Sequence, residues 1–487
     1  MTVGLLLSAC ATVLSTDVAV VGGGSAGFAA AWSAAKLGSE VVLVEREKEL
    51  GGTSTTAGVC NWEPGTGCLG VPYLVYRRLS AIPGACGVYT MDRHWCWEEG
   101  KDARDRFPGA LLKTDPALGY SDTFAGHGPD MRDEKWYRAN SHGILFEPEV
   151  MSRVMLEMLQ ETGRCTVLTG ASFAKAESTN GRLDEIVLSD GRRIRAKVFV
   201  DATDGVVCRQ LGCGIMCGRE AKSEFDEPGA PGRPVRSFNG ATLMFRVTQK
   251  EGPCEDSAEE TIPEKCWWQP SFPYVFAMTL PCGDIVINML PTMRGEEAME
   301  LGTKAASAEC RRRVLAEWRW LKRTCPHFRG YRLKSISSVL ACRETVRIRG
   351  DYVLNQNDLI AGLSGECHPD VIAIADHSMD SHGGGIENGQ LRESYGIPYR
   401  CLLPKGTENV LIAGRAASFS AIAASSCRLA RTMMQLGEAA GVAAHLAVSR
   451  ELALRQVPAE EIRCTMRERI DTGDNFAEGG SRGIEGK

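Results

Sequence analysis

The stretch TDVAVVGGGSAGFAAAWSAAKLGSEVVLVE, Thr16–Glu45, decides the fold of this chain. A Val-rich apolar run leads into three closely spaced glycines, an Ala-rich segment of helical length follows, and Val41–Val44 forms a second apolar run. This is the order strand, glycine turn, helix, strand. Within that order, the G-x-G-x-x-G spacing of Gly22, Gly24 and Gly27 predicts a dinucleotide-binding unit.

Each part of this unit has a mechanical task. We expect Gly22 to make the tight turn, Gly24 to let a pyrophosphate approach the backbone, and Gly27 to let the helix pack closely on the sheet. The helix N-terminus offers unpaired N–H groups and a positive dipole end to the phosphates. Glu45 ends the second strand, where its carboxylate would accept from both hydroxyls of an adenosine ribose. The cofactor-binding residues expected here are Gly22, Gly24, Ser25, Ala26, Gly27, Glu45 and Arg46.

Later segments supply further loops for the same cofactor. A glycine pair soon after Glu45 is typical of a flavin site, because this loop has to run close under the dinucleotide toward the isoalloxazine ring; a surface turn is the alternative. The strand Lys197–Val200 ends in small residues that let the backbone pass the cofactor, and a last strand breaks at a glycine before Arg415. These segments add Gly51, Gly52, Thr53, Ser54, Ala202, Thr203, Asp204, Gly205, Gly414, Arg415 and Arg428 to the expected cofactor site.

The composition is that of a soluble globular protein with more than one domain. Its 487 residues are 44% hydrophobic and 24% charged, with a formal net charge of −5. The chain has neither an excess of basic residues nor a Lys/Arg-rich run of the kind that indicates nucleic-acid binding. None of its apolar stretches reaches the roughly eighteen residues of a membrane span. We therefore expect a small-molecule substrate, no nucleic acid and no transmembrane segment.

The N-terminal segment Met1–Cys10, MTVGLLLSAC, has two interpretations. Its last four residues resemble a bacterial lipoprotein cleavage box at Cys10, but it lacks the basic region and the longer apolar core of a secretory signal. The nineteen cysteines are scattered and form no C-x-x-C pair, which indicates free thiols in a reducing compartment rather than a metal site. A cytoplasmic protein without a metal is the favoured expectation, and export as a lipoprotein is the alternative.

The remaining pattern predicts regular elements around long, turn-rich connections. Amphipathic spacing predicts a helix over Phe146–Glu161, and Asn180-Gly181 and Asp190-Gly191 predict two hairpins of a meander that crosses the main sheet. Further strands are expected at 241–247, 274–280 and 284–290, and further helices at 296–323 and 428–450. In the first of these helices we expect Met299, Ala306, Cys310, Leu315, Trp318 and Leu321 to be buried, and Arg311-Arg312-Arg313 to form a solvated face.

Together these elements predict an α/β fold with two domains. A Rossmann-like FAD-binding domain, with a parallel sheet and a β-meander, would comprise residues 15–60, 142–215 and 395–450. An inserted α+β substrate or cap domain would comprise residues 61–141 and 216–394. Residues 451–487 would form a C-terminal helix and a frayed tail.

The motifs resemble the bacterial FAD-dependent oxidoreductase family, which shares its two-domain plan with the glutathione reductase, fumarate reductase and p-hydroxybenzoate hydroxylase group. The resemblance covers nearly the whole chain and implies FAD in an extended pose, with its ring at the domain boundary. The segments that carry it are DVAVVGGGSAGFAAA (17–31), LVE (43–45), LGGTSTTAG (50–58), VFVDATDG (198–205), CRETVRIRGDYVL (342–354), DSH (380–382), IPYRCLLPKGTENVLIAGR (397–415) and LGEAAGVAA (436–444).

Departures from the relatives' patterns narrow the expected chemistry. Ser54 and Val59 stand where disulfide reductases of the group carry a redox cysteine pair, so thiol–disulfide exchange is not expected. Gly212-x-Gly214 lacks the third glycine and the preceding strand of an NAD(P)H site. The histidine that ties flavin covalently in fumarate reductase relatives is missing, which implies non-covalent FAD.

We expect hydride transfer between the flavin N5 and a small organic substrate, such as a polyol, a sugar derivative or a hydroxy acid. The electron acceptor is unknown. His382 would transfer the proton with Asp380 as its partner, unless both only fix a loop. Arg343 and Arg347 would hold a carboxylate or a hydroxyl array, unless they pair with Glu344 or Asp351.

Negative charge that collects near N1 and the C2 carbonyl of the flavin needs a helix N-terminus or an arginine, and the segment from Arg415 to Arg428 is the candidate. A surface cation is the alternative for Arg428. Two other functions remain open: a flavin-binding redox sensor without turnover, and a group-transfer enzyme that uses a nucleotide as substrate on the same fold.

Overall fold

The structure is a computed structural model that describes residues 13–66, 69–93, 109–124, 140–249, 274–365, 367–381, 389 and 391–471. Three features predicted from the sequence lie outside these residues: the cleavage box at Cys10, the candidate base His382, and the tail beyond Asp471. None of the described helices is both long enough and apolar enough to span a bilayer.

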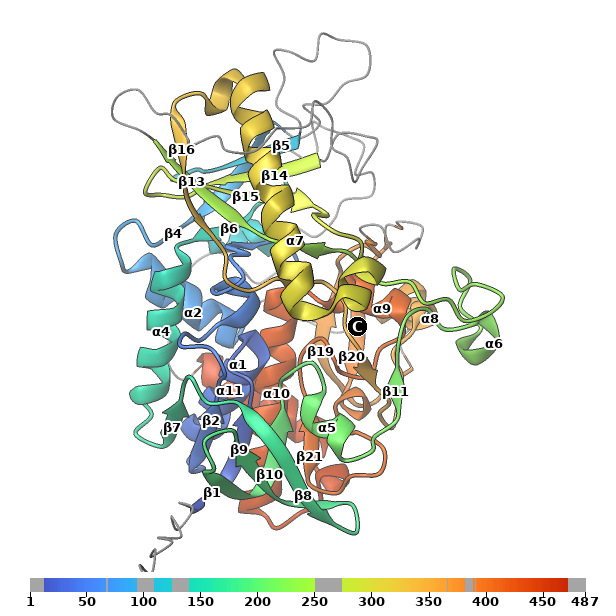
Figure 1. The fold of residues 1–487 in the computed structure, drawn as a ribbon. Helices are drawn as coiled ribbons and strands as arrows, with labels where there is room; N and C mark the ends of the chain where they lie inside the picture. The colour runs from blue at the N-terminus through green and yellow to red at the C-terminus, as the bar shows by residue number, and fades with distance from the viewer. Residues whose placement is uncertain are drawn as a thin grey trace, which may run out of the picture.

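The first sheet has seven strands and lies in the lower half of Figure 1. Its parallel part holds the expected strands, which pair through Val18–Val21 with both neighbours. An antiparallel meander continues from it, as the two hairpin signals predicted. The order is β7 (Cys165–Leu168), β2 (Val41–Val44), β1 (Val13–Val21), β10 (Arg193–Asp201), β9 (Arg182–Leu188) and β8 (Phe173–Thr179), with β21 (Val410–Ile412) on β10.

Helix α1 (Ser25–Lys36) packs against the long helix α10 (Ala430–Ser449) beside this sheet. The approach is close because α10 presents glycines to α1: a Cβ on Gly437 would overlap the carbonyl oxygen of Ala26, and one on Gly441 would overlap that of Ala30. Small residues on both helices therefore fix how the N-terminus of α1 lies over the sheet. Further helices of this half are α2 (Val71–Ser80), α4 (Pro148–Gln160), α5 (Val206–Gln210), α9 (Ala421–Cys427) and α11 (Ala459–Asp471).

The second sheet has eight strands and lies above the first in Figure 1, with α7 (Gly295–Thr324) running across it. It has its own core, in which Trp318 of α7 contacts Phe245 and Phe328 with ring centroids 6.2 and 5.9 Å away. The order is β16 (Tyr331–Ile336), β13 (Phe245–Gln249), β15 (Ile285–Leu290), β14 (Tyr274–Thr279), β5 (Gly109–Thr114), β4 (Cys86–Arg93), β6 (Gly143–Phe146) and β3 (Asn61–Trp62).

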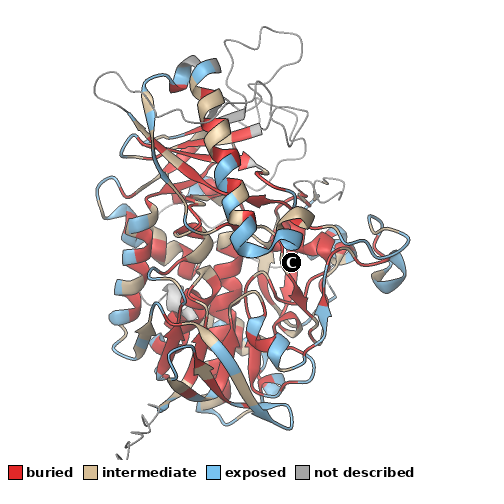
Figure 2. Ribbon diagram, in the orientation of Figure 1, coloured by how far each residue is buried: buried red, intermediate tan, exposed pale blue. Residues whose placement is uncertain are grey.

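Short elements connect the two halves. They are three two-stranded pairs, β11 (Ile215–Met216) with β18 (Arg347–Ile348), β12 (Ala241–Thr242) with β17 (Ala341–Cys342), and β19 (Val371–Ala375) with β20 (Tyr395–Pro398), and the helices α6 (Lys222–Phe225) and α8 (Gln356–Ala361). The architecture is thus α/β with parallel and mixed sheets. Figure 2 shows buried residues along the strands and inner helices, with exposed residues on the outer faces.

Four expectations about local structure were wrong. Phe146 belongs to β6, and the helix begins at Pro148, a residue that favours a first helical turn. The strand expected at 241–247 is two strands in different sheets. The helix expected at 428–450 begins at Ala430, after a separate short helix. In α7, Met299 is 39% exposed and Leu315 only partly buried.

The Arg311–Arg313 run was predicted as a solvated face, and this holds for only two of its members. Arg311 and Arg312 are exposed, whereas Arg313 is buried. Its guanidinium pairs with Glu309 at 2.8 Å and with Glu297. One turn of α7 is thereby anchored to its N-terminal part.

Candidate functional site

The glycine turn after β1 has the geometry that the three glycines predict. Gly22 has φ +100°, and a Cβ on it would lie 2.6 Å from the carbonyl oxygen of Ala202. A Cβ on Gly27 would overlap the carbonyl oxygen of Gly22. A Cβ on Gly24 would meet no atom within 4 Å, so this side of the turn is open. Gly22 and Gly27 thus allow close packing, and Gly24 faces free space where a pyrophosphate would fit.

The second glycine loop lies directly beside this open side. Gly51, with φ +101°, bridges to Gly24, and Gly52 packs against the Gly24 backbone. The loop then forms a 3-10 turn that contains Thr53, and the hydroxyl of Ser54 lies 3.5 Å from that of Ser25. The two glycine loops therefore form one continuous backbone surface.

Glu45 holds its carboxylate against the glycine turn. The buried side chain accepts the backbone N–H of Gly23 at 2.5 Å and that of Glu47 at 2.8 Å, one on each oxygen. Each oxygen keeps a second lone pair that can accept a ribose hydroxyl. Arg46 is exposed and pairs with Glu47 at 3.2 Å.

The loop after β10 packs against the glycine turn at Gly22, and we call the open space beside Gly24, bordered by these loops, the cofactor crevice. The buried Asp201 accepts Thr203 and the N–H of Cys208 at 2.9 Å, and burial raises the pKa of this carboxyl. Gly205, with φ +71°, precedes α5. Asp204 lies 3.3 Å from Arg415, the residue after Gly414, so the last strand meets this loop.

Contacts lead from these loops to five side chains that interact electrostatically, which we call the polar cluster: Glu63, Arg343, His377, Asp380 and Arg428. Arg415 donates to the carbonyl of Cys342, the neighbour of Arg343. Arg343 donates to the carbonyl of Gly240 at 3.2 Å and to the hydroxyl of Thr242 at 2.6 Å. The structure therefore brings Arg343 close to the predicted cofactor loops.

Asp380 and Arg428, both singled out in the sequence, form an ion pair with a 3.2 Å separation. The amide of Asn239 donates to the backbone carbonyl of Asp380 at 2.9 Å. Arg428 is mostly buried, so its alternative role as a surface cation is wrong. Its Nε is buried and has no hydrogen-bond partner among the described residues.

The pairing of His377 with Glu63 was not predicted from the sequence, although Glu63 follows the second glycine loop closely enough to approach the flavin ring. The buried His377 contacts the carbonyl of Ser378 through Nδ1 at 2.7 Å, and its Nε2 lies 3.3 Å from the carboxylate of Glu63. A carbonyl can only accept, so Nδ1 carries a proton, and a second proton must lie between Nε2 and the carboxylate. Burial lowers the pKa of His377, but the hydrogen bond and charge of Glu63 outweigh it and leave the pKa raised.

No local pattern would have identified this pair. Glu63 follows the short strand β3, and His377 follows β19, more than three hundred positions later. The neighbouring Trp62 is buried and packs against Phe146 with ring centroids 5.5 Å apart, so it is a packing residue. The structure thus brings together two charged groups that only the tertiary fold connects.

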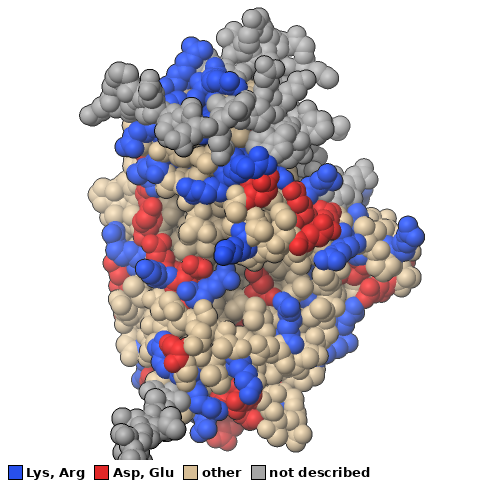
Figure 3. Space-filling view, in the orientation of Figure 1, with Lys and Arg blue, Asp and Glu red and all other residues tan. Residues whose placement is uncertain are grey.

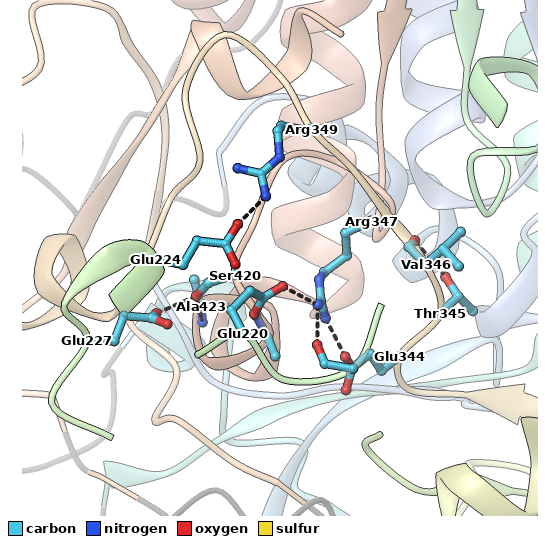
Figure 4. A network of polar contacts seen from close by, with 12 residues as sticks. Glu220, Glu224, Glu227, Glu344, Thr345, Val346, Arg347, Arg349, Ser420 and Ala423 are labelled. Carbon is cyan, nitrogen blue, oxygen red and sulfur yellow. Dashed lines mark hydrogen bonds and ion pairs between the residues drawn. The ribbon is translucent and has the colours of Figure 1, made fainter. Parts of the chain in front are cut away.

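Arg347 belongs to a different polar network, which includes Glu220 and Glu344 (Figure 4). Its fully buried guanidinium pairs with Glu220 at 2.7 Å and with Glu344, and donates to the carbonyl of Gly218 at 2.5 Å. The pairing of Arg347 with Glu344 is the structural alternative raised by the sequence, and it replaces the expected contact with substrate. Arg347 fixes the loop that follows β11.

The same network occupies the N-terminus of α9. Ser420 caps the helix and donates to Glu227 at 2.5 Å, and Glu220 accepts the N–H of Ala421 at 2.9 Å. Within the segment from Arg415 to Arg428, backbone N–H groups at the start of α9 are therefore already hydrogen-bonded by side chains of this network. The next helix, α10, begins after Leu429 without a side-chain cap and is the better candidate to face developing negative charge.

A cavity of about 410 Å³ lies between the second glycine loop and the second sheet. Residues that line it include Glu49, Thr55, Gly58, Phe245 and Ser337. No member of the polar cluster lines this cavity. On the face in Figure 3, basic and acidic side chains intermingle.

The crevice meets the steric and polar requirements of an adenine dinucleotide. It offers an open side at Gly24, a carboxylate with free lone pairs at Glu45, and a continuous glycine surface that leads toward the cluster. The described residues contain no group of three or more side chains placed to ligate a metal.

Several solved structures are similar to this chain at low sequence identity. A geranylgeranyl bacteriochlorophyll reductase-like protein from Thermoplasma acidophilum is 12% identical over 94% of this chain and 84% of its own, with a TM-score of 0.48. A probable FAD-dependent monooxygenase from Pseudomonas aeruginosa is 16% identical over 94% of each chain, with a TM-score of 0.39. The p-nitrophenol 4-monooxygenase of Pseudomonas putida is 13% identical over 94% of this chain and 81% of its own, with a TM-score of 0.40.

The family model described as FAD dependent oxidoreductase matches residues 17–466 of this chain, which is nearly its whole length. The match includes both glycine loops, the loop after β10, the last strand and the polar cluster. The protein is therefore an enzyme that uses FAD, and it belongs to the FAD dependent oxidoreductase family.

Proposed function

We propose that the enzyme transfers a hydride between a small organic substrate, such as a polyol, a sugar derivative or a hydroxy acid, and the N5 atom of non-covalently bound FAD. The contact from Arg415 to Cys342 supports this proposal, because it joins the predicted cofactor loops to the residue beside Arg343. The reacting bond of the substrate would then lie over the flavin ring, beside the polar cluster.

The residues proposed to hold FAD are those of the glycine loops. The backbone of Gly24 and the N-terminus of α1 would bind the pyrophosphate, Glu45 the ribose, and the second glycine loop the approach to the ring. FAD supplies the site that accepts or donates the hydride. The uncapped start of α10 would stabilise negative charge that develops on the ring.

The chain's own task is to manage one proton. His377 and Glu63 hold a proton between them, and Asp380 lies in the same cluster as a charge partner. We propose that His377 gives up or receives the substrate proton at Nε2 while Nδ1 stays bonded to the carbonyl of Ser378. The earlier candidate His382, which follows Asp380 closely in sequence, remains part of this proposal.

Anaerobic mixing with a panel of polyols, sugars and hydroxy acids, followed by loss of flavin absorbance, tests this function. We expect at least one compound to reduce the flavin, and Asp380→Asn to slow the reduction about 10²-fold or more. Asp190→Asn, in an exposed turn, is the matched control and should keep the wild-type rate. If no panel member reduces the flavin while dithionite does, the proposal of substrate hydride transfer fails and a redox sensor is favoured.

Exposure to oxygen or to an artificial electron acceptor after reduction then identifies the oxidant. Recovery of absorbance with a dye or quinone but not with oxygen would identify a dehydrogenase. Recovery with oxygen and stoichiometric peroxide would identify an oxidase. Either result is consistent with the proposed hydride transfer, which concerns only the reductive half of the cycle.

A further inference from the structure

Arg343 is a partly buried cation without a carboxylate partner among the described residues. Its Nη1 donates to two neutral acceptors, the carbonyl of Gly240 and the hydroxyl of Thr242. Neither acceptor neutralises the charge of the guanidinium. A buried charge without a partner is costly, so the position is arranged for an anion that the chain itself does not supply.

The neighbouring carboxylates do not neutralise the guanidinium of Arg343, because each is engaged elsewhere. Arg428 pairs with Asp380, and His377 shares a proton with Glu63, so each of these cations has one carboxylate. Glu344 follows Arg343 in sequence but is held by Arg347 and by the backbone N–H of Asn239 at 2.9 Å. The cluster of Glu63, Arg343, His377, Asp380 and Arg428 therefore contains three basic groups and two carboxylates, one carboxylate fewer than would pair every cation.

A second guanidinium lies nearby. Arg343 contacts the carbonyl of Gly240, the adjacent Asn239 donates to the Asp380 carbonyl, and Asp380 pairs with Arg428. Burial and then the charge of Arg428 lower the pKa of Arg343 to about 9, although the charges of Asp380 and Glu63 act to raise it. The Nε of Arg428 is buried and has no hydrogen-bond partner among the described residues. Two guanidinium groups with unused N–H donors match the paired oxygens of a single carboxylate, and one carboxylate carries the single negative charge that is needed.

We infer that Arg343, supported by Arg428, binds the carboxylate of the substrate, so that the enzyme acts on an organic acid rather than on a neutral polyol or sugar. The inference rests on the proposed function only in assigning the anion to a substrate. The carboxylate would anchor one end of the molecule and leave its reacting C–H bond to be placed over the ring.

Carboxylate binding is measured without turnover. Acetate, benzoate and succinate are titrated into the oxidised, FAD-loaded enzyme and followed by the flavin spectrum and by calorimetry, with acetamide and benzamide as neutral matches. We expect at least one carboxylate to bind and its amide to bind at least 10-fold more weakly. Arg343→Gln should weaken carboxylate binding about 10- to 100-fold, and Arg343→Lys should weaken it less.

Arg349→Gln is the matched control. Arg349 lies two positions beyond Arg347 and pairs with Glu224, which is not a member of the cluster (Figure 4). This variant should therefore bind carboxylates as the wild type does. If Arg343→Gln does not fold by circular dichroism, Arg428→Gln takes its place with the same expected direction.

Three results would overturn the inference: amides that bind as tightly as carboxylates, variants that keep wild-type carboxylate affinity, or loss of FAD from Arg343→Gln, which would place this guanidinium on the cofactor. The outcome is separate from that of the substrate panel. Carboxylates can bind to an enzyme that none of the panel reduces, and a neutral substrate can reduce the flavin of an enzyme that binds no carboxylate.

Discussion

At the scale of single residues, the roles of two glycines in the turn after β1 can be separated: Gly24 leaves room for the cofactor, and Gly27 allows close packing. Gly24 has ordinary backbone angles and open space beside it, whereas Gly27 packs against the Gly22 carbonyl. We predict that Gly24→Val folds normally but loses FAD affinity by 10-fold or more, since its side chain fills the place of the pyrophosphate. Gly27→Val should instead destabilise the fold itself.

Calorimetric titration of FAD and thermal unfolding of the cofactor-free proteins check this pair. The account requires a normal unfolding midpoint with weak FAD binding for Gly24→Val. Wild-type FAD affinity in Gly24→Val would show that the open side of the turn is not the cofactor crevice.

A pH-dependent prediction concerns His377. Its pKa is raised in the folded protein because Glu63 outweighs the effect of burial, relative to about 6.5 in the unfolded chain. The protonated imidazole therefore contributes stability that is fully present below about pH 6.5 and is lost as pH rises through the folded pKa. His377→Asn should cost more stability at pH 6 than at pH 9.

Urea unfolding at both pH values measures this difference, with His445→Asn as a histidine control outside the cluster. Glu63→Gln should also move the pH dependence of flavin reduction to lower pH, because it removes the charge that raises the pKa of His377. A stability loss in His377→Asn that is equal at pH 6 and pH 9 would contradict the shared proton.

Arg347 and Arg349 provide a comparison of buried and exposed ion pairs. Arg347→Met leaves Glu220 and Glu344 buried without their cation and should cost about 3–5 kcal/mol of unfolding free energy. Arg349→Met breaks a partly exposed pair with Glu224 and should cost about 1 kcal/mol or less. Chemical denaturation measures both, and similar losses would show that the network does not hold the loop.

At the scale of elements, the contact between α1 and α10 sets the cofactor crevice. A Cβ on Gly437 would overlap the Ala26 carbonyl in the first turn of α1. We predict that Gly437→Ala destabilises the protein by about 1–3 kcal/mol and also weakens FAD binding, because the N-terminus of α1 is displaced. Gly330→Ala, which has free space, is the control for both thermal unfolding and FAD titration. Unchanged FAD affinity in Gly437→Ala would show that the contact between α1 and α10 does not determine FAD binding.

Local chemistry made some elements predictable. Val41–Val44 is the strand expected from its apolar run, and Asn180-Gly181 has the two positive φ angles, 51° and 82°, of a tight hairpin turn. The break before α10 was missed because Arg428-Leu429 carries no Gly or Pro signal. Met299 was predicted to be buried on the assumption of a continuous helix. Gly302, with φ 72°, interrupts the helical phase that relates Met299 to the rest of α7, so the prediction failed.

At the scale of the whole molecule, the glycine loops were predictable and the reaction site was only partly so. The spacing of Gly22, Gly24 and Gly27 between an apolar strand and a helix indicates their role, because the backbone geometry they serve is local. The polar cluster joins Glu63 to Arg343, His377 and Arg428, all of which lie at least 280 positions later in the chain, and no periodicity links such segments. The domain limits and the cytoplasmic location expected from the sequence remain predictions.

The central claim is that segments from the beginning, middle and end of the chain form one FAD site. The most direct measurement is the cofactor content of the purified enzyme, released by heat and identified by absorbance and chromatography, for the wild type and for Gly24→Val. The account predicts one FAD per wild-type chain, released without proteolysis, and little in the folded variant. A folded wild-type protein that carries no flavin and binds none when FAD is added would contradict it.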